Sequence, residues 1–261
     1  MLHRSRTPGT PLREARARFC RAVWTRTGER RLPSGRELDA ALSALPAGEL
    51  EWLCEESPLG PLYLLPTRPF VSALARALRK LGARRVLEVS AGDGFLARAL
   101  GRAAPDLAVW ASDTGAWERP MARMSAEERR AFAGRAVPGV RLGHDVLRLG
   151  ARAAVRRTRP DVVLASWLPP GLLLDQLVRL PVRYLLEIGA GSGITASAWS
   201  WRYRHEFLEG PIEATARCRL DLRPARALHG RVTLYYGRAH PDFSVERVAP
   251  GDWLWQFRER R

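Results

Sequence analysis

A glycine-rich turn between an acidic strand end and a helix is the feature of this sequence best suited to chemistry. Residues 85–97 read RVLEVSAGDGFLA, which begins like a buried parallel strand and carries an acid, Glu88. Gly92 and Gly94 can adopt backbone angles that side chains forbid, and they let a ligand approach the turn closely. From Phe95 onward a helix begins, and its free amide groups favour an electron-rich group. The pattern therefore predicts a site for a nucleotide cofactor.

The same residues satisfy more than one pattern. The run from Gly92 to Ala97 has the GxGxx(G/A) spacing of a dinucleotide-binding turn, and an ordinary glycine turn is a third interpretation. With the acid included, the stretch resembles motif I of the class I S-adenosylmethionine-dependent methyltransferases, acid-x-Gly-x-Gly-x-Gly, with Ser90 replacing the first glycine. The resemblance implies that Glu88, Ser90, Gly92 and Gly94 bind S-adenosyl-L-methionine, with Glu88 near its amino-acid portion.

Two further acids follow predicted strands. Asp113 ends the apolar run 107–112, and both cofactor families place a carboxylate there to bind the ribose hydroxyls. A helix cap or turn is its alternative role. The segment 140–145 is predicted as a third strand ending at Asp145, which the methyltransferase resemblance makes a ligand of the adenine amino group. The neighbouring His144 either stacks on the adenine ring or fills space.

Residues that handle the methyl acceptor are expected after the predicted fourth strand, 161–166, because open α/β sheets bind ligands beyond the carboxyl ends of their strands. The string Ser-Trp-Leu-Pro-Pro is similar to motif IV of amino-group methyltransferases, (Asn/Asp/Ser)-Pro-Pro-(Tyr/Phe), with two residues inserted and the final aromatic missing. The resemblance implies that Ser166 orients the acceptor and that Trp167 stacks on it. A rigid proline loop, 167–171, with a packed tryptophan is the alternative.

A second glycine cluster, YLLEIGAGSGIT at 184–195, also resembles motif I, through Glu187, Gly189, Gly191 and Gly193. Only 68 residues follow Gly193, too few for the remaining strands and helices of a doubly wound sheet. We therefore interpret this cluster as strand five and its loop, at the substrate end of the cleft. There Glu187 would orient the acceptor or accept its proton. A duplicated half-domain is the alternative.

The order of these segments predicts an α/β fold with a doubly wound, mostly parallel, seven-stranded sheet that ends in an antiparallel hairpin. Two β-rich runs, 231–237 and 243–248, are predicted to form that hairpin. The Rossmann-like methyltransferase domain would span residues 66–261.

Residues 1–65 are predicted to form a helical extension or cap, and the methyltransferase resemblance implies that such a cap closes over the substrate. Helices are expected over 11–26, 34–45 and 49–56. The second of these begins with the spacing of a capping box, Ser34 and Glu37.

Composition restricts the partners. The net charge of +16 over 261 residues leaves nucleic acid open as a partner, whereas the dispersal of the arginines favours a solvated basic surface. No apolar run approaches the roughly 18 residues of a membrane helix. The three cysteines have neither zinc-site nor disulfide spacing, which favours a reducing cytoplasm. The arginine-rich first 30 residues keep a mitochondrial transit peptide as an alternative.

The sequence thus predicts a soluble, cytoplasmic S-adenosylmethionine-dependent methyltransferase that acts on a small-molecule acceptor and needs no metal. Methyl transfer from a sulfonium requires positioning more than a nucleophilic side chain, and a base is needed only if the acceptor carries a proton. Ser166, Trp167 and Glu187 are the candidate residues on the acceptor side, with His144 as an alternative base. A non-catalytic methyltransferase-fold scaffold, an NAD(P)-dependent oxidoreductase and an RNA methyltransferase are the alternative functions.

Overall fold

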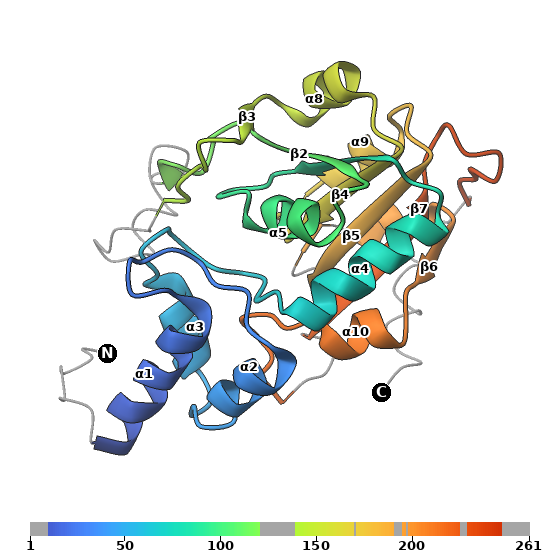
Figure 1. Ribbon diagram of the computed structural model, residues 1–261. Coiled ribbons are helices and arrows are strands. Elements are labelled where there is room, and N and C mark those ends of the chain that lie inside the picture. Colours follow the sequence, from blue (N-terminus) through green and yellow to red (C-terminus); the bar gives the residue numbers. More distant parts are fainter. Residues whose placement is uncertain are drawn as a thin grey trace, which may run out of the picture.

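The computed structural model describes residues 10–120, 139–169, 171–190, 195–196, 198–224 and 229–246. Within these ranges a single sheet of seven strands lies at the centre of the molecule (Figure 1). The strands are β1 (Arg85–Val89), β2 (Ala108–Asp113), β3 (Leu147–Arg148), β4 (Val162–Ser166), β5 (Tyr184–Ala190), β6 (His205–Phe207) and β7 (Gly230–Tyr236).

The strands lie in the order β3-β2-β1-β4-β5-β7-β6. The first five pair in parallel, and β7 runs antiparallel to both β5 and β6. The strand order therefore reverses between β1 and β4, which is the topological switch point where open α/β sheets bind ligands. The predicted fold class, a mostly parallel seven-stranded sheet with antiparallel carboxyl-terminal strands, is confirmed.

Helices cover both faces of the sheet (Figure 1). On one face lie α4 (Arg68–Lys80), α5 (Phe95–Ala103) and α10 (Pro211–Thr215), and on the other lie α8 (Ala151–Thr158) and α9 (Leu173–Val178), followed by the 3-10 helix η1 (Ala198–Arg202). Strands enclosed in this way are apolar on both faces, which explains the continuous apolar runs of β1 and β4.

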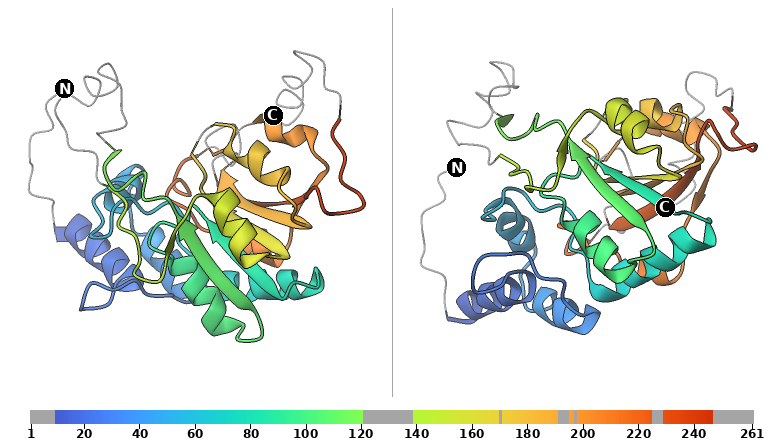
Figure 2. Two further views of the ribbon diagram at one scale, coloured as in Figure 1. Left: turned by 90° about the horizontal axis from the view of Figure 1, so that it is seen from above. Right: turned by 45° about the horizontal axis from the view of Figure 1, so that its top comes forward.

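The N-terminal helices form a separate layer beside the sheet (Figures 1 and 2). They are α1 (Thr10–Val23), α2 (Gly35–Leu42) and α3 (Glu49–Glu55), close to the predicted positions. The predicted capping box is present at the start of α2, where Ser34 and Glu37 each accept the other's backbone amide. The layer has its own core, in which Phe19, Leu38 and Leu50 are completely or almost completely buried.

Two predicted strands were wrong in position. The segment 140–145 is irregular and packs on the glycine-rich turn, since Arg98 donates one hydrogen bond to Asp145 at 2.7 Å and another to the Asp93 carbonyl at 2.7 Å. The third strand is instead β3, which has only two residues.

The predicted terminal hairpin was also wrong in its pairing, since β7 pairs with β6 rather than with residues 243–246. Residues 247 and 248 of the predicted strand lie outside the described residues. After β7 the chain turns at His240, whose ring accepts the backbone amide of Asp242 at 3.0 Å. Of the predicted second strand, Val245 makes one bridge to Tyr203 and is 46% exposed. Phe243 packs against the core beside Tyr203, whereas Val245 does not continue the buried face. Among the helices that the structure describes, none has the length and apolar character needed to cross a membrane.

Candidate functional site

A cavity of about 800 Å³ opens at the carboxyl ends of β1, β2 and β4. This volume lies within the range of small-molecule and cofactor sites, roughly 300–1,000 Å³. Both the sheet and the N-terminal layer supply its walls. The sheet side includes Glu88, Ser90, Gly92, Asp93, Asp113, Ser166 and Trp167, and the opposite side includes Arg30, Glu51, Tyr63 and Leu64.

Glu88 is a buried acid that holds the start of α5. Its side chain is 2% exposed, and Oε2 accepts the backbone amide of Ala97 at 2.9 Å. The helix needs this partner because its N-cap residue, Gly94, has no side chain to accept a first-turn amide. Burial raises the pKa of the Glu88 carboxyl to about 8, although the Ala97 amide acts in the opposite direction.

The glycine-rich turn is built from left-handed backbone conformations. The φ angles are 52° at Ser90, 54° at Gly92 and 69° at Gly94. Ser90 therefore adopts the conformation that the motif normally gives to glycine, at a cost of about 1–3 kcal/mol. Gly94 does not line the cavity, and a Cβ there would lie 2.7 Å from the Val146 side chain. Its predicted contact with a cofactor stays a prediction.

Asp113 ends β2 and holds the turn from the neighbouring strand. Its Oδ2 accepts the amide of Gly92 at 3.0 Å, and its Oδ1 accepts the amide of Gly115 at 2.8 Å. An ionised carboxylate has about four acceptor positions, so each oxygen keeps one for a further donor. Asp113 can therefore hold the turn and still accept hydrogen bonds from the ribose hydroxyls of a cofactor.

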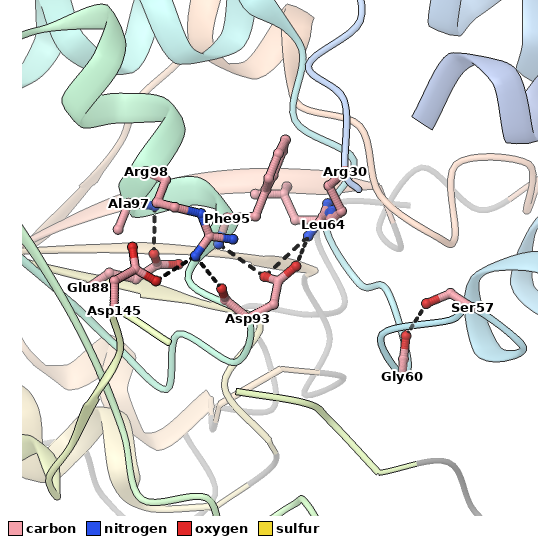
Figure 3. A network of polar contacts seen from close by, with 10 residues as sticks. All are labelled: Arg30, Ser57, Gly60, Leu64, Glu88, Asp93, Phe95, Ala97, Arg98 and Asp145. Atoms are coloured by element: carbon pink, nitrogen blue, oxygen red, sulfur yellow. Dashed lines mark hydrogen bonds and ion pairs between the residues drawn. The ribbon is translucent and has the colours of Figure 1, made fainter. Parts of the chain in front are cut away.

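Arg30 reaches the same turn from the N-terminal layer, and sequence reasoning missed it (Figure 3). Its guanidinium lies 3.3 Å from the Asp93 carboxylate, donates to the Leu64 carbonyl at 3.2 Å and lies 4.2 Å from the ring centroid of Phe95. Only 12% of the Arg30 side chain is exposed. Asp93 in turn accepts the Phe95 amide at 3.0 Å, so the ion pair fixes the first turn of α5.

The predicted adenine ligand, Asp145, lies away from the cavity wall. It pairs with Arg98 at 2.7 Å (Figure 3). Neither Asp145 nor the exposed His144 lines the cavity. Their contacts with a cofactor stay predictions.

Beyond β4, Ser166 and Trp167 both line the cavity. Trp167 has a φ of 53°, and its amide donates to the Ile188 carbonyl at 2.7 Å. Its ring stacks on Tyr63 of the opposite wall, with 5.8 Å between centroids and 23° between planes. The indole Nε1 is buried and has no hydrogen-bond partner among the described residues. Of the proline loop that follows, Pro170 lies outside the described residues.

Glu187 lies behind the cavity wall rather than in it. It is 7% exposed, and the Thr195 hydroxyl donates to its Oε1 at 3.0 Å. Burial raises the pKa of the Glu187 carboxyl to about 7, against the opposing effects of Thr195 and Arg231. Thr195 itself lines the cavity. Gly191 and Gly193 of the second glycine cluster lie outside the described residues.

The described part of the chain contains no group of three or more His, Cys, Asp or Glu residues that could hold a metal ion. Cys20, Cys54 and Cys218 form no disulfide among the described residues.

Comparisons with known proteins give only distant structural likenesses. No protein-family model matches the chain, and no curated protein matches it. The chain is similar to the solved structure of the 23S rRNA methyltransferase ErmE, with 16% identity, 68% of this chain and 70% of that chain covered, and a TM-score of 0.34.

It is also similar to a putative O-methyltransferase from Klebsiella pneumoniae, with 14% identity, 88% and 92% of the two chains covered, and a TM-score of 0.37. A third similar structure is that of the plantazolicin methyltransferase BpumL in complex with SAH, with 11% identity, 65% of this chain and 83% of that chain covered, and a TM-score of 0.35. All three are methyltransferases by name. At these scores the argument for a function rests on the residues of the cavity.

Proposed function

We propose that the protein binds S-adenosyl-L-methionine in this cavity and transfers its methyl group to a small-molecule acceptor. One observation carries the proposal. The ends of two adjacent strands, β1 and β2, place Glu88 and Asp113 around a left-handed turn that opens into a cavity of about 800 Å³ at the switch point of the sheet.

The residues present fit this cofactor. The two free acceptor positions of Asp113 suit a pair of ribose hydroxyls. Gly92 and Ala91 line the cavity at the turn and leave room for a ligand against the backbone. Glu88, a carboxyl group of raised pKa in the wall, favours a nearby positive charge because a cation stabilises its ionised form. The bound cofactor would supply a methyl group activated on a sulfonium.

The remaining residues would hold the acceptor. Ser166 offers a hydroxyl at the end of β4, and the stacked rings of Trp167 and Tyr63 offer an aromatic surface beside it. Positioning of this kind lowers the barrier to an in-line displacement. A small acceptor is favoured because the cavity is bounded on both sides and has a volume of only about 800 Å³.

Isothermal titration with S-adenosylhomocysteine and with NAD(P) tests the proposal. We expect micromolar binding of S-adenosylhomocysteine and no binding of NAD(P). Asp113→Ala should weaken that binding at least about tenfold, since a hydrogen bond to a charged group contributes about 1.5–3 kcal/mol. The matched control is Asp106→Ala, because Asp106 is exposed and pairs with Arg79 outside the cavity wall.

Preferential NAD(P) binding would make the protein an oxidoreductase, and binding of neither ligand would leave a scaffold. The acceptor class is tested separately, by titrating RNA fragments across a salt series. RNA held by six or more phosphate contacts would lose roughly a thousandfold or more in affinity between 50 and 200 mM salt. Submicromolar binding near physiological salt that discriminates one RNA from the others would replace the small acceptor with RNA.

A further inference from the structure

Thr195 connects the buried Glu187 carboxyl to the cavity. Its hydroxyl is 3.0 Å from Glu187 Oε1, and Thr195 lines the cavity while Glu187 does not. The neighbouring residue, Ala196, donates its amide to the Leu168 carbonyl at 3.1 Å. This bond fixes Thr195 beside the loop after β4, where the acceptor is proposed to bind.

The structure makes specific room for this pair at Gly189. A Cβ on Gly189 would lie 2.1 Å from Glu187 Oε1 and 2.1 Å from Thr195 Oγ1, closer than any real contact. Only glycine therefore allows the carboxyl and the hydroxyl to meet here. This requirement gives a physical role to a glycine of the second cluster that no cofactor contact explains.

The Thr195 hydroxyl has one proton and two acceptors. It lies 3.0 Å from Glu187 Oε1 and 2.9 Å from the Ala190 carbonyl. When Glu187 is ionised, the hydroxyl donates to the carboxylate. When Glu187 is protonated, the acid donates to Thr195 and the hydroxyl turns to Ala190. Both protonation states are therefore satisfied by the same three residues.

The charges around Glu187 allow both states near neutral pH. Burial raises the pKa of Glu187 to about 7, while Arg231 on β7 and the Thr195 hydroxyl act to lower it. Tyr235, also on β7, faces the same carboxyl, and its own pKa is raised well above the usual range by burial and by Glu187. Tyr235 therefore stays neutral, and Arg231 is the cation that acts on the pair.

We propose that Thr195 carries protons between the cavity and Glu187, so that the pair takes up the proton that a hydroxyl or amino acceptor loses on methylation. This inference rests on the proposed function. The bond from the acceptor atom to the methyl carbon forms as the carbon–sulfur bond breaks and its electron pair goes to sulfur. The acceptor proton passes to Thr195 Oγ, the Thr195 proton passes to Glu187, and the net charge is conserved.

Infrared spectroscopy of the whole protein tests the connection without any acceptor. The C=O band of protonated Glu187 is isolated at pH 6 by subtracting the spectrum of Glu187→Gln, and its shift is followed after transfer to D₂O. In Thr195→Val the exchange should slow at least about tenfold, which corresponds to about 1.4 kcal/mol on the barrier. The band should also disappear at higher pH than in the wild type, because the hydrogen bond to the carboxylate is lost. Thr195→Ser should restore both properties.

Exchange as fast in Thr195→Val as in the wild type would overturn the inference, as would the absence of any Glu187 band that titrates near neutral pH. Gly189→Ala keeps both side chains but separates them, so it should slow exchange independently of the threonine variants. Thr158→Val is the matched control, since the Thr158 hydroxyl also donates to a backbone carbonyl, at 2.9 Å, on α8. Failure to bind S-adenosylhomocysteine would count against the proposed function. The exchange rate of the Glu187 proton would still test the role of Thr195, because that measurement needs no ligand.

Discussion

The most informative single substitution is Glu88→Gln. It removes the ionisable group, whose burial lowers the free energy of unfolding at high pH, and keeps an acceptor for the Ala97 amide. The pKa of Glu88 rises from an ordinary value of 4.5 to about 8 on folding. An acid whose pKa is raised in the folded state stabilises that state least at high pH. Its contribution is complete below about pH 4.5 and is lost as the pH rises through about 8. At 1.36 kcal/mol per pKa unit, the wild type loses roughly 5 kcal/mol at most across this window.

Glutamine at position 88 can still accept the Ala97 amide but has no proton to lose. We therefore expect Glu88→Gln to become more stable relative to the wild type as the pH rises from 5 to 9, by roughly 2–4 kcal/mol. Urea unfolding of both proteins at each pH measures the difference. Glu187 ionises in both proteins, so its effect cancels from the difference between their free energies of unfolding.

The reasoning is refuted if the two stability curves run parallel from pH 5 to 9. That result would mean that Glu88 ionises in the folded protein as an exposed glutamate does. A constant offset between the curves would report only the change in packing and in the hydrogen bond to Ala97.

Three other predictions concern the same cavity. Ser90→Gly should raise the free energy of unfolding by about 1 kcal/mol, because it relieves a left-handed φ of 52°, and urea unfolding measures this gain. Glu88→Gln should weaken S-adenosylmethionine binding in calorimetry while Glu187→Gln leaves it unchanged, and the reverse pattern would show that the second glycine cluster binds the cofactor. Arg30→Met should weaken S-adenosylhomocysteine binding several-fold by releasing the turn. Arg31→Met should not, because the ion pair of Arg31 with the partly buried Glu37 lies outside the cavity wall.

The sequence predicted the features that depend on neighbouring residues. The strand–turn–helix at 85–97 and the capping box at Ser34 form from local propensities and short hydrogen bonds, and both are present. The position of Asp113 followed from the geometry of parallel strands, whose carboxyl ends lie side by side. Such features are determined by residues that are close together in the sequence, so they can be predicted without knowing the fold.

The features that were missed depend on distant contacts. Arg30 is one of 43 basic residues, and only the fold brings it to Asp93, 63 positions later. The run 243–248 alternates as a strand should, yet β7 already has β5 and β6 as neighbours and offers no free edge. The segment 140–145 was misassigned because its backbone amides bond to turns rather than to a strand: Val140 donates to the Trp117 carbonyl and Arg141 to the Leu59 carbonyl.

The two walls of the cavity are encoded in different stretches of the chain. Residues before α4, joined by Arg219 and Leu220, form one wall, and the ends of the strands with their loops form the other. Substitutions in the first stretch can therefore change which acceptor fits while the residues proposed for the cofactor stay the same. Over evolutionary time such a protein can acquire new acceptors without passing through variants that have lost the cofactor. The ion pair between Arg30 and Asp93 and the stacking of Trp167 on Tyr63 limit this freedom, because at these contacts a change in one wall disturbs the other.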